Sequence, residues 1–234
     1  MFIAKKQYLD ARKATKNAAF QVWQQSVPKI LTVCIFCGNI IYVKSSRFEF
    51  AKGDDSLKKI YILLSRTETA PARVIRAVTK GYFSHVSLSL YPRTDHFYSY
   101  ARRHVDLPMF AGFVSENIHT KVFARYPDAP CAVYAFTVSD ESYMKAKKLI
   151  RYFRLNKQRA TYSFLGAPAM QLGLPVKRKY KYTCSQFAAF VLHYSGAVRL
   201  HKDPYLMFPD DFPKIKGAEL VYEGKLKDCK IPAK

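Results

Sequence analysis

The sequence predicts an α+β fold in which an antiparallel sheet packs against helices. Apolar and polar residues alternate strictly over residues 84–91, which indicates a half-buried strand. Residues 139–157 instead repeat apolar positions at helical spacing, and they begin with a serine that can cap the first turn. Short apolar runs bounded by turn residues precede this helix, as expected for strands of one sheet.

The elements of the predicted core follow one another along the chain. Residues 60–65 are a buried-strand candidate, and residues 70–81 suit a short helix that ends at Gly81. A turn signal at 92–95 leads into a partner strand at 97–101. The remaining predicted segments are strands at 121–127, 131–138 and 218–224 and a long loop at 161–183, with room for one helical turn.

The first part of the chain is predicted to be an extension outside this core. Residues 4–26 are rich in helix formers, and Pro28 stops the run. Residues 30–43 are apolar but include Asn39 and are too short to span a bilayer, so they predict a buried strand or strand pair, or a segment that dips into a membrane. We therefore expect an N-terminal extension at 1–56 and a second domain at 57–234.

The charge of the chain predicts attraction to anions. The 234 residues include 39 Lys and Arg against 17 Asp and Glu, a net charge of +22, while 49% hydrophobic residues are enough for a folded core. Nucleic acid, anionic lipid and anionic cell-wall polymer would all be attracted. No nucleic-acid-binding motif accompanies the dispersed basic residues, so we expect weak binding to anionic surfaces and no specific nucleic-acid recognition.

The cysteines do not indicate a disulfide framework or a metal site. There are five, an odd number. Cys34 and Cys37 form a C-x-x-C pair, but no second pair of cysteines or histidines follows at zinc spacing, and the pair lies in an apolar run. We expect neither a metal nor an organic cofactor.

Cys184 has the sequence context of a nucleophile. It follows Thr183, a candidate N-cap, and it opens a run with helical apolar spacing that ends near Gly196. A cysteine in the first turn of a helix lies near unpaired backbone N–H groups and the positive end of the helix dipole. This environment favours the nucleophilic thiolate, although a buried structural cysteine would fit the same pattern.

A cysteine nucleophile needs a base, and His85 is the best candidate among the six histidines. It begins the strand at 84–91, on the polar face that it shares with Ser87 and Ser89. His193 lies nine residues after Cys184, too far along one helix to contact it. The others lie in segments that resemble loops or turns.

These two motifs together resemble the circularly permuted papain-like cysteine hydrolases, which include relatives of the NlpC-like cell-wall peptidases and the lecithin–retinol acyltransferase-like enzymes. "SHVSLSLYPRTDHFYSYARR" resembles the family's histidine strand, and "YTCSQFAAFVL" resembles its later cysteine helix. The likeness covers roughly residues 58–215. It implies a papain-like antiparallel sheet packed against the helix that carries the cysteine, with Cys184 as nucleophile and His85 as general base.

The resemblance also implies a third polar residue that orients the histidine from the next strand. That strand, "FYSYA", has no His, Asn, Asp or Glu, so Ser99 is the candidate, with His96 at the strand's edge as a second. Gln186 points elsewhere on the helix and is interpreted as structural.

The function that follows is a cysteine-dependent amidase or peptidase that works through a thioester, with cell-wall peptide or a small amide as substrate. A lipid acyltransferase or thioesterase at a membrane surface is a second reading, because the basic surface and apolar segment suit a membrane substrate. A basic binding protein without catalytic activity is a third. A bacterial source is implied by the resemblance, in the cytoplasm or associated with membrane or cell wall.

Overall fold

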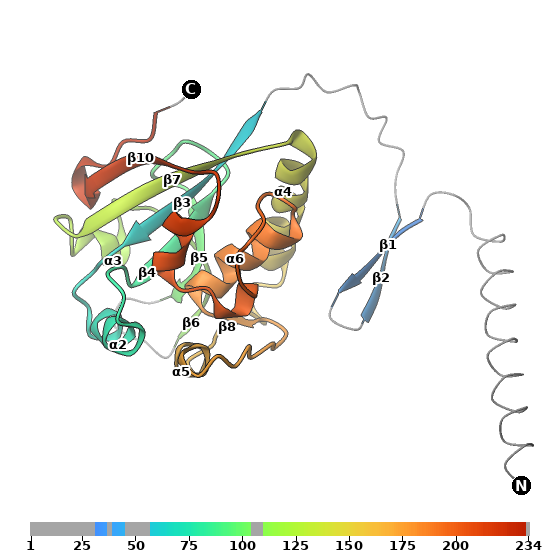
Figure 1. Ribbon diagram of the computed structural model, residues 1–234, viewed down its shortest axis with the longest axis horizontal. Helices are drawn as coiled ribbons and strands as arrows, with labels where there is room; N and C mark the ends of the chain where they lie inside the picture. Colours follow the sequence, from blue (N-terminus) through green and yellow to red (C-terminus); the bar gives the residue numbers. More distant parts are fainter. Residues whose placement is uncertain (1–30, 37–38, 45–56, 104–109, 233–234) are drawn as a thin grey trace, which may run out of the picture. The chain divides into compact units, whose positions relative to one another are not determined.

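The computed structural model describes residues 31–36, 39–44, 57–103 and 110–232 (Figure 1). The chain divides into two compact units, Met1–Lys52 and Gly53–Lys234. The predicted helix at 4–26 lies outside the described residues, as does Cys37 of the C-x-x-C pair.

In the first unit, the apolar run forms a strand pair. Strand β1 (Leu31–Phe36) runs antiparallel to β2 (Asn39–Lys44), with Leu31 opposite Lys44 and Phe36 opposite Asn39. Of the alternatives for residues 30–43, the strand pair is therefore the one observed. Among the described residues, no helix is both long and apolar enough to cross a bilayer.

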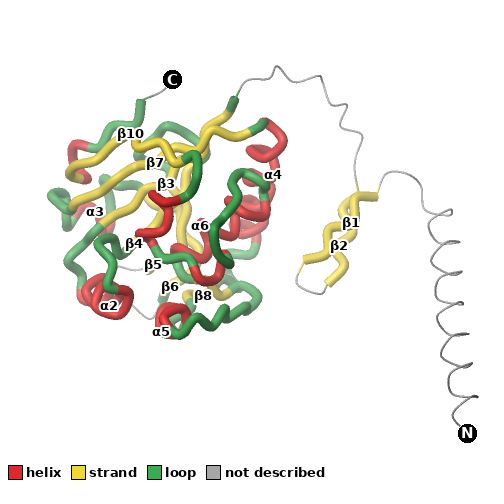
Figure 2. Tube along the Cα trace, in the orientation of Figure 1, coloured by secondary structure: helices red, strands yellow, loops and turns green. Residues whose placement is uncertain are grey.

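The second unit is built on a six-stranded sheet, drawn in yellow in Figure 2. Its spatial order is β10-β7-β3-β4-β5-β6, and every neighbouring pair is antiparallel. The strands are β3 (Lys58–Ser65), β4 (His85–Ser89), β5 (Phe97–Arg102), β6 (Ala111–Glu116), β7 (Pro130–Val138) and β10 (Ala218–Lys225). The mixed α/β architecture with an antiparallel sheet matches the predicted fold class.

Helices complete the second unit, and short 3₁₀ turns follow α6 toward the C-terminus. The α-helices are α2 (Ala70–Thr79), α3 (Lys121–Ala124), α4 (Asp140–Leu155), α5 (Gly166–Gln171) and α6 (Cys184–Tyr194). The 3₁₀ turns are η1 (Pro204–Leu206), η2 (Pro209–Lys214) and η3 (Leu226–Asp228). Helix α4 begins where predicted, because the Ser139 side chain accepts a hydrogen bond from Ser142 N at 3.2 Å.

Both faces of the sheet are covered. Helices α4 and α6 pack together, and α6 lies on β4 and β5 (Figure 1). The opposite face carries a second apolar cluster that includes Leu63, Phe97 and Phe123 of α3. The strand at 84–91 was predicted to be half-buried, and this is wrong: Ser87 and Ser89 are as buried as Val86 and Leu88. Their hydroxyls are accommodated because Ser87 donates to Glu116 and Ser89 to the carbonyl of Tyr91.

Two further segments differ from the predictions. Residues 121–127 were expected to be a strand, but Lys121–Ala124 form α3, where the buried Phe123 anchors one helical turn on the sheet. A single buried aromatic fits one helical turn as well as a strand, so the local pattern could not distinguish them. The expected loop at 161–183 contains α5 and a small parallel pair, β8 (Thr161–Tyr162) with β9 (Lys181–Tyr182).

Candidate active site

The first turn of α6 is fixed by a reciprocal cap. Gln186 N donates to the Thr183 hydroxyl at 3.2 Å, and Thr183 N donates to Gln186 Oε1 at 2.9 Å. The Gln186 amide also donates to the carbonyl of Tyr205, so its role is structural, as interpreted from the sequence. Cys184 is thereby held as the first residue of the helix.

The cap leaves two backbone donors free beside the thiol. Gln186 N is occupied by the cap and Phe187 N by the carbonyl of Thr183. Within the part of the chain that the structure describes, no hydrogen-bond acceptor faces Cys184 N or Ser185 N. The positive end of α6 and two unpaired N–H groups therefore lie at the cysteine, which suits the binding of a negatively charged oxygen.

His85 is bound by a carboxylate from the far edge of the sheet. Its Nε2 lies 3.0 Å and 3.1 Å from the two oxygens of Glu116, at the end of β6. The Ser87 hydroxyl donates to the same carboxylate at 2.5 Å. The His85 and Glu116 side chains are 18% and 14% exposed, so water screens their attraction only in part. The Phe123 ring lies beside the imidazole, with ring centroids 6.1 Å apart.

The same histidine interacts with the cysteine. Burial alone would lower the pKa of His85, but the charge of Glu116 and hydrogen bonds with Cys184 and Glu116 outweigh it and raise that pKa to about 10. Because Nε2 faces Glu116, Nδ1 is the ring nitrogen left for the thiol. Near neutral pH, His85 is therefore an imidazolium between a carboxylate and a cysteine sulfur.

A third side chain, Tyr162, also reaches the sulfur. The parallel pairing of β8 with β9 places Tyr162 beside Tyr182, two residues before Cys184. Burial, then the charge of Cys184 and a hydrogen bond with it, raise the pKa of Tyr162 well above its usual value near 10. The phenol therefore keeps its proton and can donate a hydrogen bond beside the Cys184 sulfur.

The structure brings together two of the three residues chosen from the sequence. Cys184 and His85 meet, but Ser99 does not take the orienting position: its buried hydroxyl donates to the carbonyl of Val86 at 2.6 Å. The alternative, His96, is hydrogen-bonded to the Tyr98 hydroxyl at 2.6 Å. The partner of His85 is Glu116, 31 residues away in sequence. The expectation for Ser99 is corrected on this geometry.

Neither Glu116 nor Tyr162 was among the site residues predicted from the sequence. Glu116 lies in the stretch "FAGFVSENI", which was not predicted to be a strand and forms β6. An acidic residue closing an apolar segment was the available signal. Tyr162 lies in a segment read as a loop, and nothing in its local sequence marks it among 17 tyrosines.

The other described thiols lie away from this cluster. Cys131 on β7 and Cys229 after η3 are free and buried in the apolar cluster on the opposite side of the sheet from α6. A hydrogen bond from Cys131 lowers the pKa of Cys229, and the same bond raises that of Cys131. In the described ranges, no group of three or more His, Cys, Asp or Glu side chains is arranged to hold a metal ion.

No protein-family model matches this chain, and no curated protein matches its sequence.

The Thr183 cap gives a first testable result. Replacing Thr183 with Ala removes the acceptor for Gln186 N at the start of a buried helix, so we expect a loss of about 1–2 kcal/mol in the free energy of unfolding. Urea denaturation followed by circular dichroism measures it. Thr120→Ala is the matched control, because Thr120 makes no side-chain cap bond to α3 and its replacement should cost less. An equal loss in both variants would contradict the proposed importance of the cap.

Proposed function

We propose that this protein is a cysteine hydrolase that cleaves amide or peptide bonds through a thioester on Cys184. The observation that carries the proposal is the Cys184 side chain at the start of α6, in contact with an imidazolium that Glu116 binds from the other side. A nucleophile, a base and a group that orients the base are the minimum for this chemistry.

The reaction begins with attack of the Cys184 sulfur on the carbonyl carbon of the substrate. A C–S bond forms, and the carbonyl electrons move to the oxygen. Collapse of this tetrahedral intermediate breaks the C–N bond, and the His85 imidazolium gives its proton to the departing amine. Water then attacks the thioester while His85 accepts a proton, and the C–S bond breaks to release the carboxylic acid and the thiolate.

The developing oxyanion has donors close to the sulfur. The free N–H groups of Cys184 and Ser185 are fixed by the helix cap, so they need no reorganisation during the reaction. The Tyr162 phenol, held protonated beside the sulfur, is a further donor. Glu116 acts as a positioning residue: it holds Nε2 and keeps the imidazole charged.

The architecture agrees with a papain-like assignment. The chain order His85, Glu116, Cys184 places the cysteine helix after the histidine strand, as in the permuted members of the family that the sequence resembles. Helix α6 packs on β4, the strand that carries His85. We propose membership of this superfamily on these grounds.

The experiment is trapping of the acyl-enzyme. The full chain is mixed with a panel of muropeptide-like amides, simple amides, acyl esters and acyl thioesters. The reaction is quenched in acid, and the mass of the intact protein is measured by mass spectrometry. We expect one substrate class to add its acyl mass to the wild type and not to Cys184→Ala. Cys131→Ala is the control that should still form the adduct, because Cys131 lies in the other cluster.

The panel also distinguishes the other readings. Adducts formed by acyl lipids and not by amides, with transfer to a second lipid, would identify a lipid acyltransferase or thioesterase at a membrane surface. No adduct with any class would favour a basic binding protein that uses its charge of +22 on anionic surfaces.

A further inference from the structure

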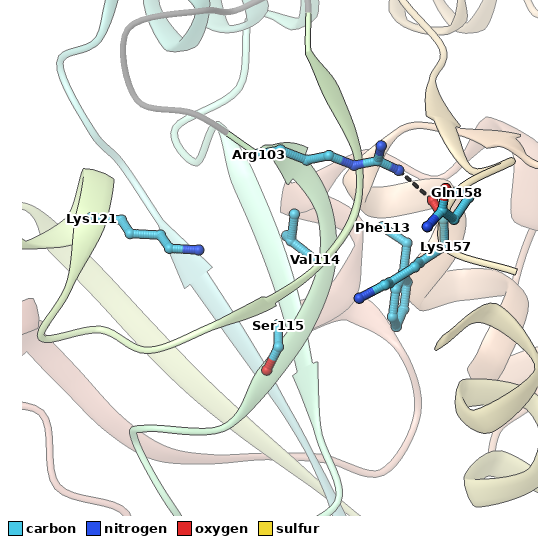
Figure 3. Close-up of a pocket in the computed structure, with 7 residues that line it drawn as sticks. All are labelled: Arg103, Phe113, Val114, Ser115, Lys121, Lys157 and Gln158. Atoms are coloured by element: carbon cyan, nitrogen blue, oxygen red, sulfur yellow. Dashed lines mark hydrogen bonds between the residues drawn. The ribbon is translucent and has the colours of Figure 1, made fainter. Parts of the chain in front are cut away.

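A basic pocket lies against the edge strand that carries Glu116. It has a volume of about 480 Å³, within the range of small-ligand sites. Its floor is formed by Phe113, Val114 and Ser115 of β6 (Figure 3). Its sides come from three separate segments, which contribute Arg103, Lys121 and the pair Lys157–Gln158.

The described lining of this pocket is positively charged. Three of its lining side chains are cations, and no acidic side chain lines it among the described residues. Figure 3 shows the ammonium groups of Lys121 and Lys157 pointing toward the space between them. In the described part of the chain, neither of these ammonium groups has an ion-pair partner. Most of the acidic residues nearby in the sequence are paired with other cations. Like charges gathered around a hollow attract an anion into it.

The Arg103 guanidinium is held in place by backbone carbonyls, and Lys121 has an unusual backbone conformation. The Arg103 guanidinium donates to the carbonyls of Lys157 and Ala160, the second at 2.7 Å, and thereby ties the end of β5 to the segment after α4. Lys121 has a left-handed backbone, with φ of 54°, which is rare for a residue with a side chain. The fold thus keeps a lysine at a position that glycine or asparagine would occupy with less strain.

The pocket and the catalytic cluster share two elements. Val114 and Glu116 lie on the same face of β6, two residues apart, which is roughly 7 Å along a strand. Lys121 and Phe123 both belong to α3, and Phe123 lies beside the His85 ring. A ligand in the pocket is therefore within reach of the reacting centre if it is part of a larger molecule.

The donors fit a phosphate monoester better than a carboxylate. A phosphate monoester carries a charge of −1.5 to −2 near pH 7 and three acceptor oxygens. The space is surrounded by two ammonium groups, a guanidinium and the neutral donors of Ser115 and Gln158. Together they offer more hydrogen-bond donors than one carboxylate can accept. The apolar side chains of Phe113 and Val114 leave a surface for the organic part of the ester.

We propose that this pocket binds a phosphate monoester group carried by the substrate, and so directs the adjoining acyl group to Cys184. The assignment rests on the proposed hydrolase function. Lys121 and Lys157 bind the phosphate, and Arg103 adds charge while it fixes the wall of the pocket.

The test is calorimetric titration with two probes, inorganic phosphate and N-acetyl-O-phosphoserine amide, in low-salt buffer at pH 7.5. It is run on the full chain as wild type, Lys121→Gln/Lys157→Gln and Lys147→Gln/Lys148→Gln. The last variant removes the same charge from exposed positions of α4 outside the pocket. We expect the pocket variant to lose at least about tenfold in affinity for the phosphoserine probe and the α4 variant to stay within about twofold.

Each alternative outcome overturns the assignment. Equal losses in both double variants would mean attraction by net charge alone. Equal affinity of the wild type for both probes would mean a site for free phosphate and not for a substrate. If N-acetylserine amide bound as tightly as its phosphorylated form, the phosphate would make no contribution to binding. Cys184→Ala should bind the phosphoserine probe like the wild type, so this titration can succeed or fail independently of acyl-enzyme trapping.

Discussion

Iodoacetamide at neutral pH should modify Cys184 roughly tenfold faster than Cys131 or Cys229. Cys184 lies at the N-terminus of α6 and interacts with His85, whereas Cys131 and Cys229 lie in the apolar cluster on the other side of the sheet, so Cys184 is expected to react faster. Mass spectrometry of partly labelled, digested protein measures the order. We expect Cys34 and Cys37 to react more slowly as well, because only Cys184 combines a predicted helix N-terminus with a candidate base.

The comparison with Cys229 makes this test sharp. Cys184 and Cys229 are each 4% exposed, so access alone does not favour either. Cys229 is the strongest competitor because its pKa is lowered by Cys131. His85→Ala should abolish the preference, whereas His96→Ala should retain it, because His96 is bound to Tyr98 and not to the site. Equal labelling of the described thiols, or faster labelling of another, would contradict the proposed nucleophile.

His85 should lose its proton only near pH 10, and Glu116→Gln should lower this pKa strongly. The amide keeps the shape of the carboxylate but removes its negative charge, which offsets the cost of burying the charged imidazolium. Proton NMR of the histidine ring, assigned by comparison with His85→Ala, follows the titration. Ser99→Ala is the matched control and should titrate like the wild type, because Ser99 binds the carbonyl of Val86.

The same shift predicts how stability depends on pH. The folded-state pKa of His85, about 10, is raised above the value of about 6.5 expected in the unfolded chain. Its stabilising contribution is therefore complete below pH 6.5 and is lost as the pH rises through 10. The difference in melting temperature between wild type and Glu116→Gln should be largest near pH 6 and shrink toward pH 10. If His85 of the wild type titrated near pH 6.5, or if Glu116→Gln left its pKa unchanged, the assignment of Glu116 as its partner would be wrong.

Features that depend on neighbours within a few residues could be read from the sequence. Thr183 and Gln186 cap the start of α6, and Gly196, in the left-handed region, follows its end. Both sets of interactions join residues only three to six positions apart, so the local sequence was enough to predict them. The Ser139 cap and the buried stripe of α4 followed for the same reason. The pairing of Cys184 with His85 required the family resemblance in addition.

Only the tertiary structure decided what lies around that pair. The order β4-β5-β6 brings the Glu116 carboxylate to His85 from beyond the neighbouring strand, so a partner predicted on β5, Ser99, was the wrong residue. The apolar cluster around α3 buries the second face of β4, which strict alternation had assigned to solvent. Local sequence determined where Cys184 and His85 stand in their own elements, because propensity and capping act over a few residues. Strand order and register, set by packing between segments that are distant in the sequence, decided their partners.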